Sequence, residues 1–214
     1  MPLLGKNRPG SARLQKEVSG LVFRNPLGTT SRLLKRASFI VTVPPKDKVI
    51  DWLSGIKSRH PGQLTAVDIA EDFQRLFSLS YDFADLLIIN TDRDGGINAM
   101  DISDTVNLLD SLLALRLCYE KYTPVYLRIS NMVTPEEIHT LVSYCRLSGI
   151  DGIVVQSIPK LKAVTEESLG RIPVMGITRD AEEAVNMFNG GASLVVLDTY
   201  PLLFKRTLKI LEKQ

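Results

Sequence analysis

Short apolar runs alternate with longer amphipathic stretches along the chain, and this alternation restricts the fold more than any other feature of the sequence. Clear examples of the apolar runs are residues 38–43 (SFIVTV) and 86–89 (LLII). Runs this short and this apolar are typical of strands that are buried on both faces, as in a parallel sheet. Strands are therefore predicted at residues 21–29, 38–43, 64–70, 85–91, 124–130, 152–157, 173–178 and 193–199.

Helical periodicity occupies most of the segments between these strands. Residues 134–148 show it well, because Ile138, Leu141, Val142 and Cys145 recur at helical spacing after Thr134, a candidate N-cap. Helices are predicted at residues 46–59, 71–83, 101–121, 134–148, 180–189 and 201–213. The first connection, around residues 31–37, is too short for a full helix. Alternating strands and helices predict an α/β fold, and eight strands fit a compact (β/α)8 TIM barrel better than an open sheet.

The length of 214 residues suits one such barrel, which we place at residues 20–214 after an N-terminal extension at residues 1–19. Lysine and arginine together exceed aspartate and glutamate by two (26 against 24), so the bulk charge gives no reason to expect a nucleic-acid partner. The densest basic stretch lies within the first 36 residues. A solvated N-terminus is the preferred interpretation, and an arm that binds polyanions is the alternative.

Several other classes of protein are disfavoured by the composition. No apolar run approaches the roughly 18–20 residues that a membrane span requires. The N-terminus lacks the hydrophobic segment of a signal peptide, so we expect a cytoplasmic protein without a membrane partner. Cys118 and Cys145 both fall inside predicted helices, where buried thiols are expected. With two histidines in the chain, a Cys/His zinc site is not expected, and no metal ligand is proposed.

Polar residues close most of the apolar runs. In a TIM barrel the carboxyl ends of the strands surround a common mouth, so these residues predict a polar pocket there. The alternative is that strand ends are polar simply because they meet loops. Arg128 is the most informative member, since a buried guanidinium requires a carboxylate, a phosphate or a ligand as its partner. The polar strand ends are Thr29, Thr30, Asp68, Asn90, Arg128, Gln156, Ser157, Thr178, Asp198 and Thr199.

Four segments, taken in order, resemble the dihydroorotate dehydrogenase family. Residues 20–28 (GLVFRNPLG) resemble its first strand, and residues 84–90 (ADLLIIN) resemble its fourth strand, whose asparagine contacts the pyrimidine. Residues 149–154 (GIDGIV) and 190–195 (GGASLV) are similar to its sixth strand and to the approach to its eighth. The resemblance implies a TIM barrel that oxidises a dihydropyrimidine by proton abstraction at a Ser or Cys base and hydride transfer to FMN.

The chain departs from this family where the chemistry is performed. Residues 91–95 (TDRDG) replace the stretch that contains the Ser or Cys base, and residues 29–31 (TTS) replace a flavin-binding segment. Lys35 matches a lysine that follows that segment, and Arg128 stands at the position of the flavin-side lysine. Ser157 lies near the position of an expected asparagine.

The two segments that the resemblance assigns to the FMN phosphate are also altered. Thr178 and Arg179 replace a pair of glycines, and side chains there block close approach of the backbone. Thr199 fits the family, but Asp198 places a carboxylate near the position of the anion. The candidate ligand-binding residues are Lys35, Asp68, Asn90, Arg128, Gln156, Ser157, Thr178, Asp198 and Thr199, and no catalytic residue is assigned.

Residues 90–101 (NTDRDGGINAMD) resemble a twelve-residue calcium loop, with oxygen-bearing side chains at several ligand positions and Gly95 at the turn. Asn90 and Asp101 replace the aspartate and glutamate expected at the two ends. The preferred interpretation is a glycine turn followed by Asp101 as the N-cap of the next helix.

Three functions remain open at this point. The first is a diverged dihydroorotate dehydrogenase-like barrel that has lost the FMN redox chemistry and binds a small ligand, for which an anion is a candidate, or a partner. It implies no cofactor. The second is an FMN-dependent oxidoreductase acting on dihydroorotate or a similar dihydropyrimidine. The third is an enzyme of another class that uses Asp68, Asn90, Arg128 and Asp198 on a small anion. The missing base favours the first function. The sequence leaves self-association open.

Overall fold

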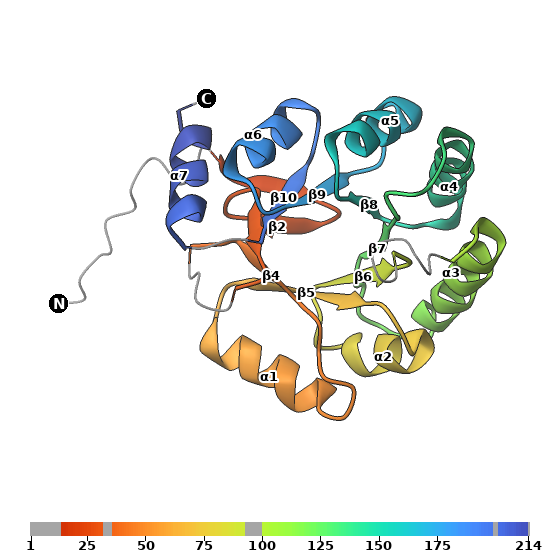
Figure 1. The fold of residues 1–214 in the computed structure, drawn as a ribbon. Helices are drawn as coiled ribbons and strands as arrows, with labels where there is room; N and C mark the ends of the chain where they lie inside the picture. The colour runs from red at the N-terminus through yellow and green to blue at the C-terminus, as the bar shows by residue number, and fades with distance from the viewer. Residues whose placement is uncertain (1–13, 32–35, 93–99, 199–200, 214) are drawn as a thin grey trace.

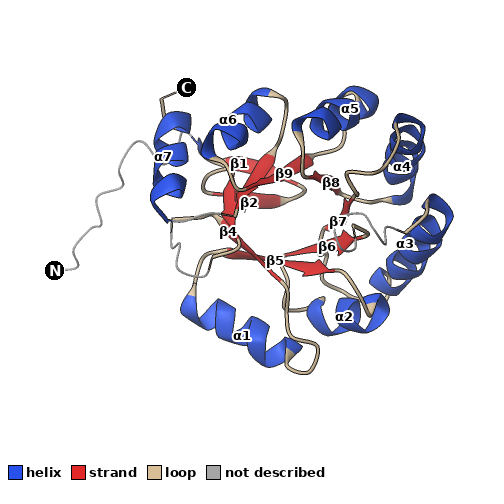
Figure 2. Ribbon diagram, in the orientation of Figure 1, coloured by secondary structure: helices blue, strands red, loops and turns tan. Residues whose placement is uncertain are grey.

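Eight parallel strands form a closed barrel (Figures 1 and 2), in a computed structural model that describes residues 14–31, 36–92, 100–198 and 201–213. The strand order around the barrel is β10-β3-β4-β5-β6-β7-β8-β9. Each strand therefore neighbours the next along the chain, and the last closes on the first. The strands are β3 (Leu27–Thr29), β4 (Phe39–Thr42), β5 (Leu64–Ile69), β6 (Leu86–Asn90), β7 (Val125–Arg128), β8 (Gly152–Val155), β9 (Val174–Thr178) and β10 (Leu194–Leu197). The predicted (β/α)8 TIM barrel is confirmed.

Helices surround the barrel and pack their apolar faces on the outer side of the strands (Figure 2). They are α1 (Val49–Arg59), α2 (Phe73–Ser80), α3 (Ile102–Arg116), α4 (Pro135–Ser148), α5 (Ile158–Ser168), α6 (Ala181–Asn189) and α7 (Pro201–Leu211). The predicted start of α4 is correct: Thr134 and Glu137 form a reciprocal capping box, and the helix ends at Gly149 in the left-handed conformation.

One apolar cluster lies between the strands and the helices, and a second, separate cluster fills the barrel interior. Large side chains are accommodated because glycines stand opposite them. A Cβ at Gly28 would lie 2.3 Å from the ring of Phe39, and one at Gly152 would lie 2.5 Å from the ring of Tyr126. The cluster consists of Val18, Phe23, Phe39, Val41, Ala66, Leu86, Ile88, Tyr126, Val154, Met175, Leu194 and Val196. The interior is therefore a packed core below the mouth.

A hairpin of β1 (Lys16–Val18) and β2 (Leu21–Phe23) closes the end of the barrel opposite the mouth. The prediction of one strand over residues 21–29 is wrong, because β2 and β3 are separate. Between them the Asn25 side chain accepts a hydrogen bond from the Leu27 backbone N–H at 3.1 Å, an Asx turn that redirects the chain into the barrel. The hairpin includes residue 20, so the predicted boundary between the N-terminal extension and the barrel domain falls within it. That boundary stays a prediction.

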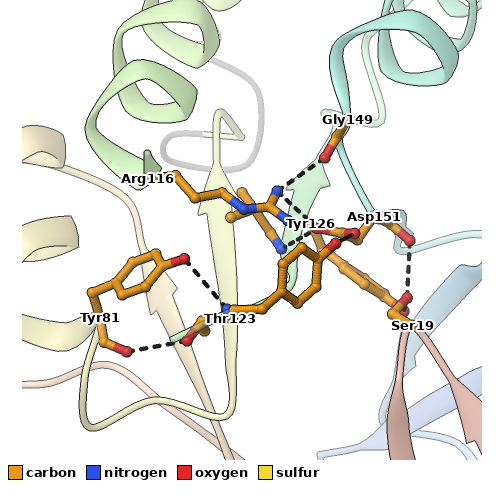
Figure 3. A network of polar contacts seen from close by, with 9 residues as sticks. Ser19, Tyr81, Arg116, Thr123, Tyr126, Gly149 and Asp151 are labelled. Carbon is orange, nitrogen blue, oxygen red and sulfur yellow. Dashed lines mark hydrogen bonds and ion pairs between the residues drawn. The ribbon is translucent and has the colours of Figure 1, made fainter. Parts of the chain in front are cut away.

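Polar contacts around Asp151 tie this closed end together (Figure 3). The Asp151 carboxylate accepts hydrogen bonds from the Val125 backbone N–H at 2.8 Å and from the Arg116 guanidinium at 3.1 Å, and from the Tyr122 hydroxyl. The Ser19 hydroxyl donates to the Asp151 carbonyl oxygen at 3.0 Å and lies 2.9 Å from the hydroxyl oxygen of Tyr126. The network joins the hairpin, α3, β7 and β8 at the end of the barrel opposite the mouth.

Two helix predictions need correction. The helix expected at residues 101–121 ends at Arg116, and Cys118 beyond it is exposed, contrary to the expected burial. Cys145 is buried as expected, and desolvation raises the pKa of its thiol to about 12. Helix α5 was not predicted, although Leu161 and Val164 are buried on its inner face. Among the described helices, none is both long and apolar enough to cross a membrane.

Candidate functional site

The two-residue period of the strands brings five of the predicted site residues to the mouth. Asp68, Asn90, Arg128, Gln156 and Asp198 each follow an interior residue by two positions, which places them on the same inward-facing side of their strands. The interior residues that precede them are Ala66, Ile88, Tyr126, Val154 and Val196. The mouth is therefore an extension of the barrel interior in which apolar side chains give way to polar ones.

Arg128 has the carboxylate partner that its position requires. Its Nη1 lies 2.8 Å from Oδ2 of Asp68 on β5, two strands away, and both side chains are largely buried. Its Nη2 lies 3.9 Å from Oδ2 of Asp92, which follows β6. The guanidinium is thus held between two carboxylates, and its positive charge is already neutralised by the protein.

Asp92 connects this ion pair to β6 and β8. The Gln156 side-chain amide donates a hydrogen bond to Asp92, and the Asp92 backbone N–H donates to Oδ1 of Asn90 at 3.0 Å. Nε of Arg128 and Oδ1 of Asp92 and of Asp68 are buried atoms of the cluster without a hydrogen-bond partner of good geometry among the described residues. Buried polar atoms without partners are costly, so these atoms are candidate contacts for a ligand or an ordered water.

The environment of Asp68 alters its protonation. Burial raises the pKa of the Asp68 carboxyl above its ordinary value of 3.8, and Asp92 adds to this effect; Arg128 and Asn90 oppose it. A carboxyl group in this setting holds a proton more readily than an exposed one.

We expect the stability of Asp68→Asn, relative to the unmodified protein, to increase as the pH rises. A carboxyl whose folded-state pKa is raised contributes stability that is complete below its unfolded pKa and is lost as the pH rises through the folded value. Asparagine does not titrate, so the variant lacks this pH dependence. Loss of the ion pair with Arg128 also changes the free energy of unfolding, so the prediction concerns how the stability difference changes with pH and not its size. Urea denaturation from roughly pH 4 to 8 measures the trend, with exposed Asp47→Asn as the control. A difference that stays constant or falls with pH contradicts the assignment.

A second polar cluster lies on the opposite side of the mouth, after β9 and β10. The Asp198 carboxylate accepts hydrogen bonds from the Thr30 hydroxyl and from Nε of Arg179, the latter at 3.2 Å. The Thr178 hydroxyl donates to the Glu183 carboxylate on the first turn of α6. Two carboxylates therefore stand on this side, and the exposed guanidinium of Arg179 pairs with one of them.

This cluster tests whether the chain could hold the FMN phosphate that the resemblance implies at this position. A helix N-terminus binds phosphate through free backbone N–H groups. At α6 the N–H groups of Glu182 and Glu183 both donate to Oδ1 of Asp180, at 2.8 Å each. The neighbouring carboxylates of Glu183 and Asp198 would repel a phosphate dianion. The residues present here do not fit that group.

A cavity of about 490 Å³ opens between the two clusters. This volume lies in the range of small-molecule sites. Its polar lining carries three carboxylates and two guanidinium groups, and its apolar floor is the top of the barrel interior. The lining residues are Thr30, Val41, Asp68, Arg128, Gln156, Ile177, Thr178, Arg179, Glu183, Val196 and Asp198.

Four predicted site residues lie beside the cavity, elsewhere, or outside the described part of the chain. Asn90 is buried beside the cavity, and its Oδ1 accepts the hydrogen bond from the backbone N–H of Asp92. Ser157 is one position out of phase with the inner face and is the N-cap of α5. Lys35 and Thr199 lie outside the described residues.

Sequence reasoning did not assign Asp92 or Glu183 to the site. Glu183 had one usable signal, since the first turn of a helix after a barrel strand lies beside the mouth. Asp92 lies within the calcium-like loop, and no local pattern of the sequence indicates its contact with Arg128, which comes from another strand.

The calcium-like loop is described only at its two ends, because residues 93–99 lie outside the described part of the chain. At the far end, Asp101 is the N-cap of α3 and accepts a hydrogen bond from the Asp104 backbone N–H at 2.7 Å, as predicted. Among the described residues, no group of three or more His, Cys, Asp or Glu side chains is arranged to hold a metal ion.

Comparison with known proteins shows similarity at the level of the fold. No protein-family model and no curated protein sequence matches the chain. Among solved structures, ligand-free dihydroorotate dehydrogenase (DHODH) from Eimeria tenella superimposes with a TM-score of 0.76 at 12% identity, over 98% of this chain and 88% of that one. DHODH from the same organism in complex with ferulenol gives a TM-score of 0.70 at 14% identity, over 99% and 85%. The chain therefore has a DHODH-like fold.

Proposed function

We propose that this chain is a diverged DHODH-like barrel that binds a small polar ligand in the mouth and has lost the standard FMN redox chemistry. One observation carries the proposal: the cavity of about 490 Å³, lined by charged side chains from both halves of the barrel. Buried Nε of Arg128 and Oδ1 of Asp92 offer a donor and an acceptor to a molecule in or beside it. A fold similarity alone would not support a function, so the argument depends on this site.

The charges of the lining indicate the chemistry of the ligand. Asp68, Glu183 and Asp198 outnumber Arg128 and Arg179, and both guanidinium groups pair with carboxylates of the mouth. A ligand that offers hydrogen-bond donors as well as acceptors matches this arrangement better than a simple anion does. The small anionic ligand expected from the sequence stays a prediction.

The loss of FMN chemistry is supported by the residues at the two ends of the expected flavin site. Asp180 caps the backbone N–H groups that would hold the phosphate, and the carboxylates of Glu183 and Asp198 stand next to them. At the pyrimidine side, the guanidinium of Arg128 pairs with Asp68 where the resemblance places a lysine. These features support a ligand-binding role over the alternative of an FMN-dependent oxidoreductase.

Thermal unfolding in the presence of small polar molecules tests the proposal. The panel contains orotate, dihydroorotate, uracil, amino acids and sugars, and each compound is compared in three proteins. Ile177→Trp places a large side chain in the cavity, and Leu147→Trp places the same side chain on the exposed surface of α4 as the matched control. We expect at least one compound to raise the Tm of the unmodified protein and the control but not of Ile177→Trp. Equal shifts in all three proteins, or none with any compound, would contradict binding at the mouth.

A further inference from the structure

The polar cluster around Asp68 contains more carboxylate groups than cations. Among the described residues, Arg128 is the one cation that pairs with Asp68 and Asp92, and it lies between them. Both carboxylate side chains are less than one-tenth exposed, and Oδ1 of each has no hydrogen-bond partner of good geometry. With both groups ionised, this end of the cavity therefore keeps hydrogen-bond acceptors and one excess negative charge after Arg128 has been paired.

The polar cluster after β9 and β10 has the same balance of charge. Glu183 and Asp198 supply two carboxylates, and the guanidinium of Arg179 pairs with Asp198. This guanidinium is 87% exposed, so water screens its charge. The hydroxyl groups of Thr30 and Thr178 already donate to the two carboxylates, so both hydroxyl donors are used within the protein. The described residues of this cluster therefore also offer acceptors and an excess of negative charge.

The two clusters face each other across an apolar floor. Asp68 is on β5 and Thr178 is on β9, and these strands lie on opposite sides of the closed barrel, with three strands between them in either direction (Figure 2). The cavity of about 490 Å³ lies between the clusters, and its apolar lining is Val41, Ile177 and Val196. A ligand that spans the cavity would therefore meet carboxylates at both ends and aliphatic side chains in the middle.

We propose that the mouth binds an aliphatic diamine, with one ammonium group at each cluster and the methylene chain over Val41, Ile177 and Val196. This inference rests on the proposed function and narrows its ligand from a polar molecule to a dication. An ammonium group has three N–H donors and no acceptor, which matches the acceptors left at each end. Its charge also offsets the excess carboxylate charge of each cluster.

Other classes of ligand match this arrangement less well. A dianion would meet an excess of negative charge at both ends, and an uncharged sugar would leave that excess unpaired. A single metal ion would need ligands that converge on one point, and among the described residues no three His, Cys, Asp or Glu side chains do so. With a diamine bound, the buried Nε of Arg128 is left to an ordered water.

Isothermal titration calorimetry at low salt measures the binding. A series of diamines from ethylenediamine to hexamethylenediamine joins the panel of compounds that tests the proposed function. Butylamine, butanediol and succinate are the matched compounds with one ammonium group, with none and with the opposite charge. We expect one chain length to bind best, at least about tenfold more tightly than butylamine, and to bind more weakly as salt is added. An optimum length is the mark of a molecule that bridges two fixed sites.

Substitutions at the two ends locate the ammonium groups. Asp68→Asn and Asp198→Asn each leave one carboxylate beside one guanidinium, so the excess negative charge of that cluster is lost. Each should weaken binding of the best diamine at least about tenfold and abolish the optimum of chain length. Asp47→Asn removes an exposed carboxylate outside the cavity and should change the affinity by no more than about twofold.

The contrary outcomes are distinguishable. If an uncharged or zwitterionic compound of the panel binds and no diamine does, the proposed function stands and the diamine is wrong; if no compound binds, both are wrong. Equal affinity for the diamines and butylamine, or an equal loss in all three variants, contradicts a dication held at two ends. Tighter binding of Mg²⁺ through the same carboxylates would assign the site to a metal ion. Circular dichroism checks folding, and Glu183→Gln, with the same expected loss, replaces a variant that does not fold.

Discussion

Arg128→Met is expected to lower the free energy of unfolding by about 3–5 kcal/mol, the cost of leaving a buried carboxylate without its partner. Asp68 and Asp92 both face this guanidinium, and their side chains are 7% and 4% exposed. Methionine retains much of the length of the arginine side chain, so the loss reports the charge more than the packing. Urea denaturation monitored by circular dichroism gives the value.

Two further variants make this prediction specific. Arg179→Met is the matched control, because that guanidinium is 87% exposed and its ion pair with Asp198 should contribute at most about 1 kcal/mol. Adding Asp68→Leu to Arg128→Met should recover part of the loss, since one of the two unpaired carboxylates is then removed. Equal effects of the two arginine substitutions would contradict the buried ion pair at the mouth.

Phe39→Ala is expected to destabilise the barrel by about 3–5 kcal/mol, the usual cost of truncating a buried phenylalanine. The ring is 1% exposed and packs edge-to-face against Phe23 at a centroid distance of 5.3 Å. Gly28→Ala alone should cost about 1–3 kcal/mol, because its new Cβ would lie 2.3 Å from that ring.

A double-mutant cycle tests the contact between Gly28 and Phe39. In the Phe39→Ala background the ring is gone, so Gly28→Ala should cost much less than it does alone. Gly55→Ala on α1 is the control, since a Cβ there meets only the end of a flexible arginine side chain and alanine favours the helix. Additive effects of Gly28→Ala and Phe39→Ala would mean that the ring does not fill the barrel above Gly28.

The barrel could be predicted from the sequence because strands buried on both faces leave a strong local signal. Every strand of the barrel falls within a predicted segment. The errors have local causes. Asn25 forms an Asx turn inside the predicted strand at residues 21–29 and divides it into β2 and β3. The buried face of α5 is formed by Leu161, Val164 and Ser168. Because Ser168 is polar, the apolar pattern of this short helix, which begins beside Pro159, is incomplete in the sequence.

The polar residues at the mouth could be predicted from the sequence, but the ion pairs between them could not. The two-residue period aligns Asp68, Arg128 and Asp198 on the inner face of their strands, and a buried arginine calls for an anionic partner. The identity of that partner could not be predicted, because Asp68 and Arg128 are 60 residues apart and meet only when the barrel closes. Capping of α6 by Asp180 was likewise visible only in three dimensions, since aspartate at that position is also a common turn residue.

We propose that this barrel combines a DHODH-like fold with loss of the FMN redox chemistry, and an FMN titration tests this proposal most directly. The absorbance spectrum of the purified protein is recorded before and after FMN is added, and flavin fluorescence quenching follows binding. We predict a colourless protein with no saturable quenching, because the carboxylates of Glu183 and Asp198 stand at the end of the mouth to which the resemblance assigns the FMN phosphate. A yellow protein, or saturable binding in the micromolar range, would contradict the claim and support an FMN-dependent oxidoreductase.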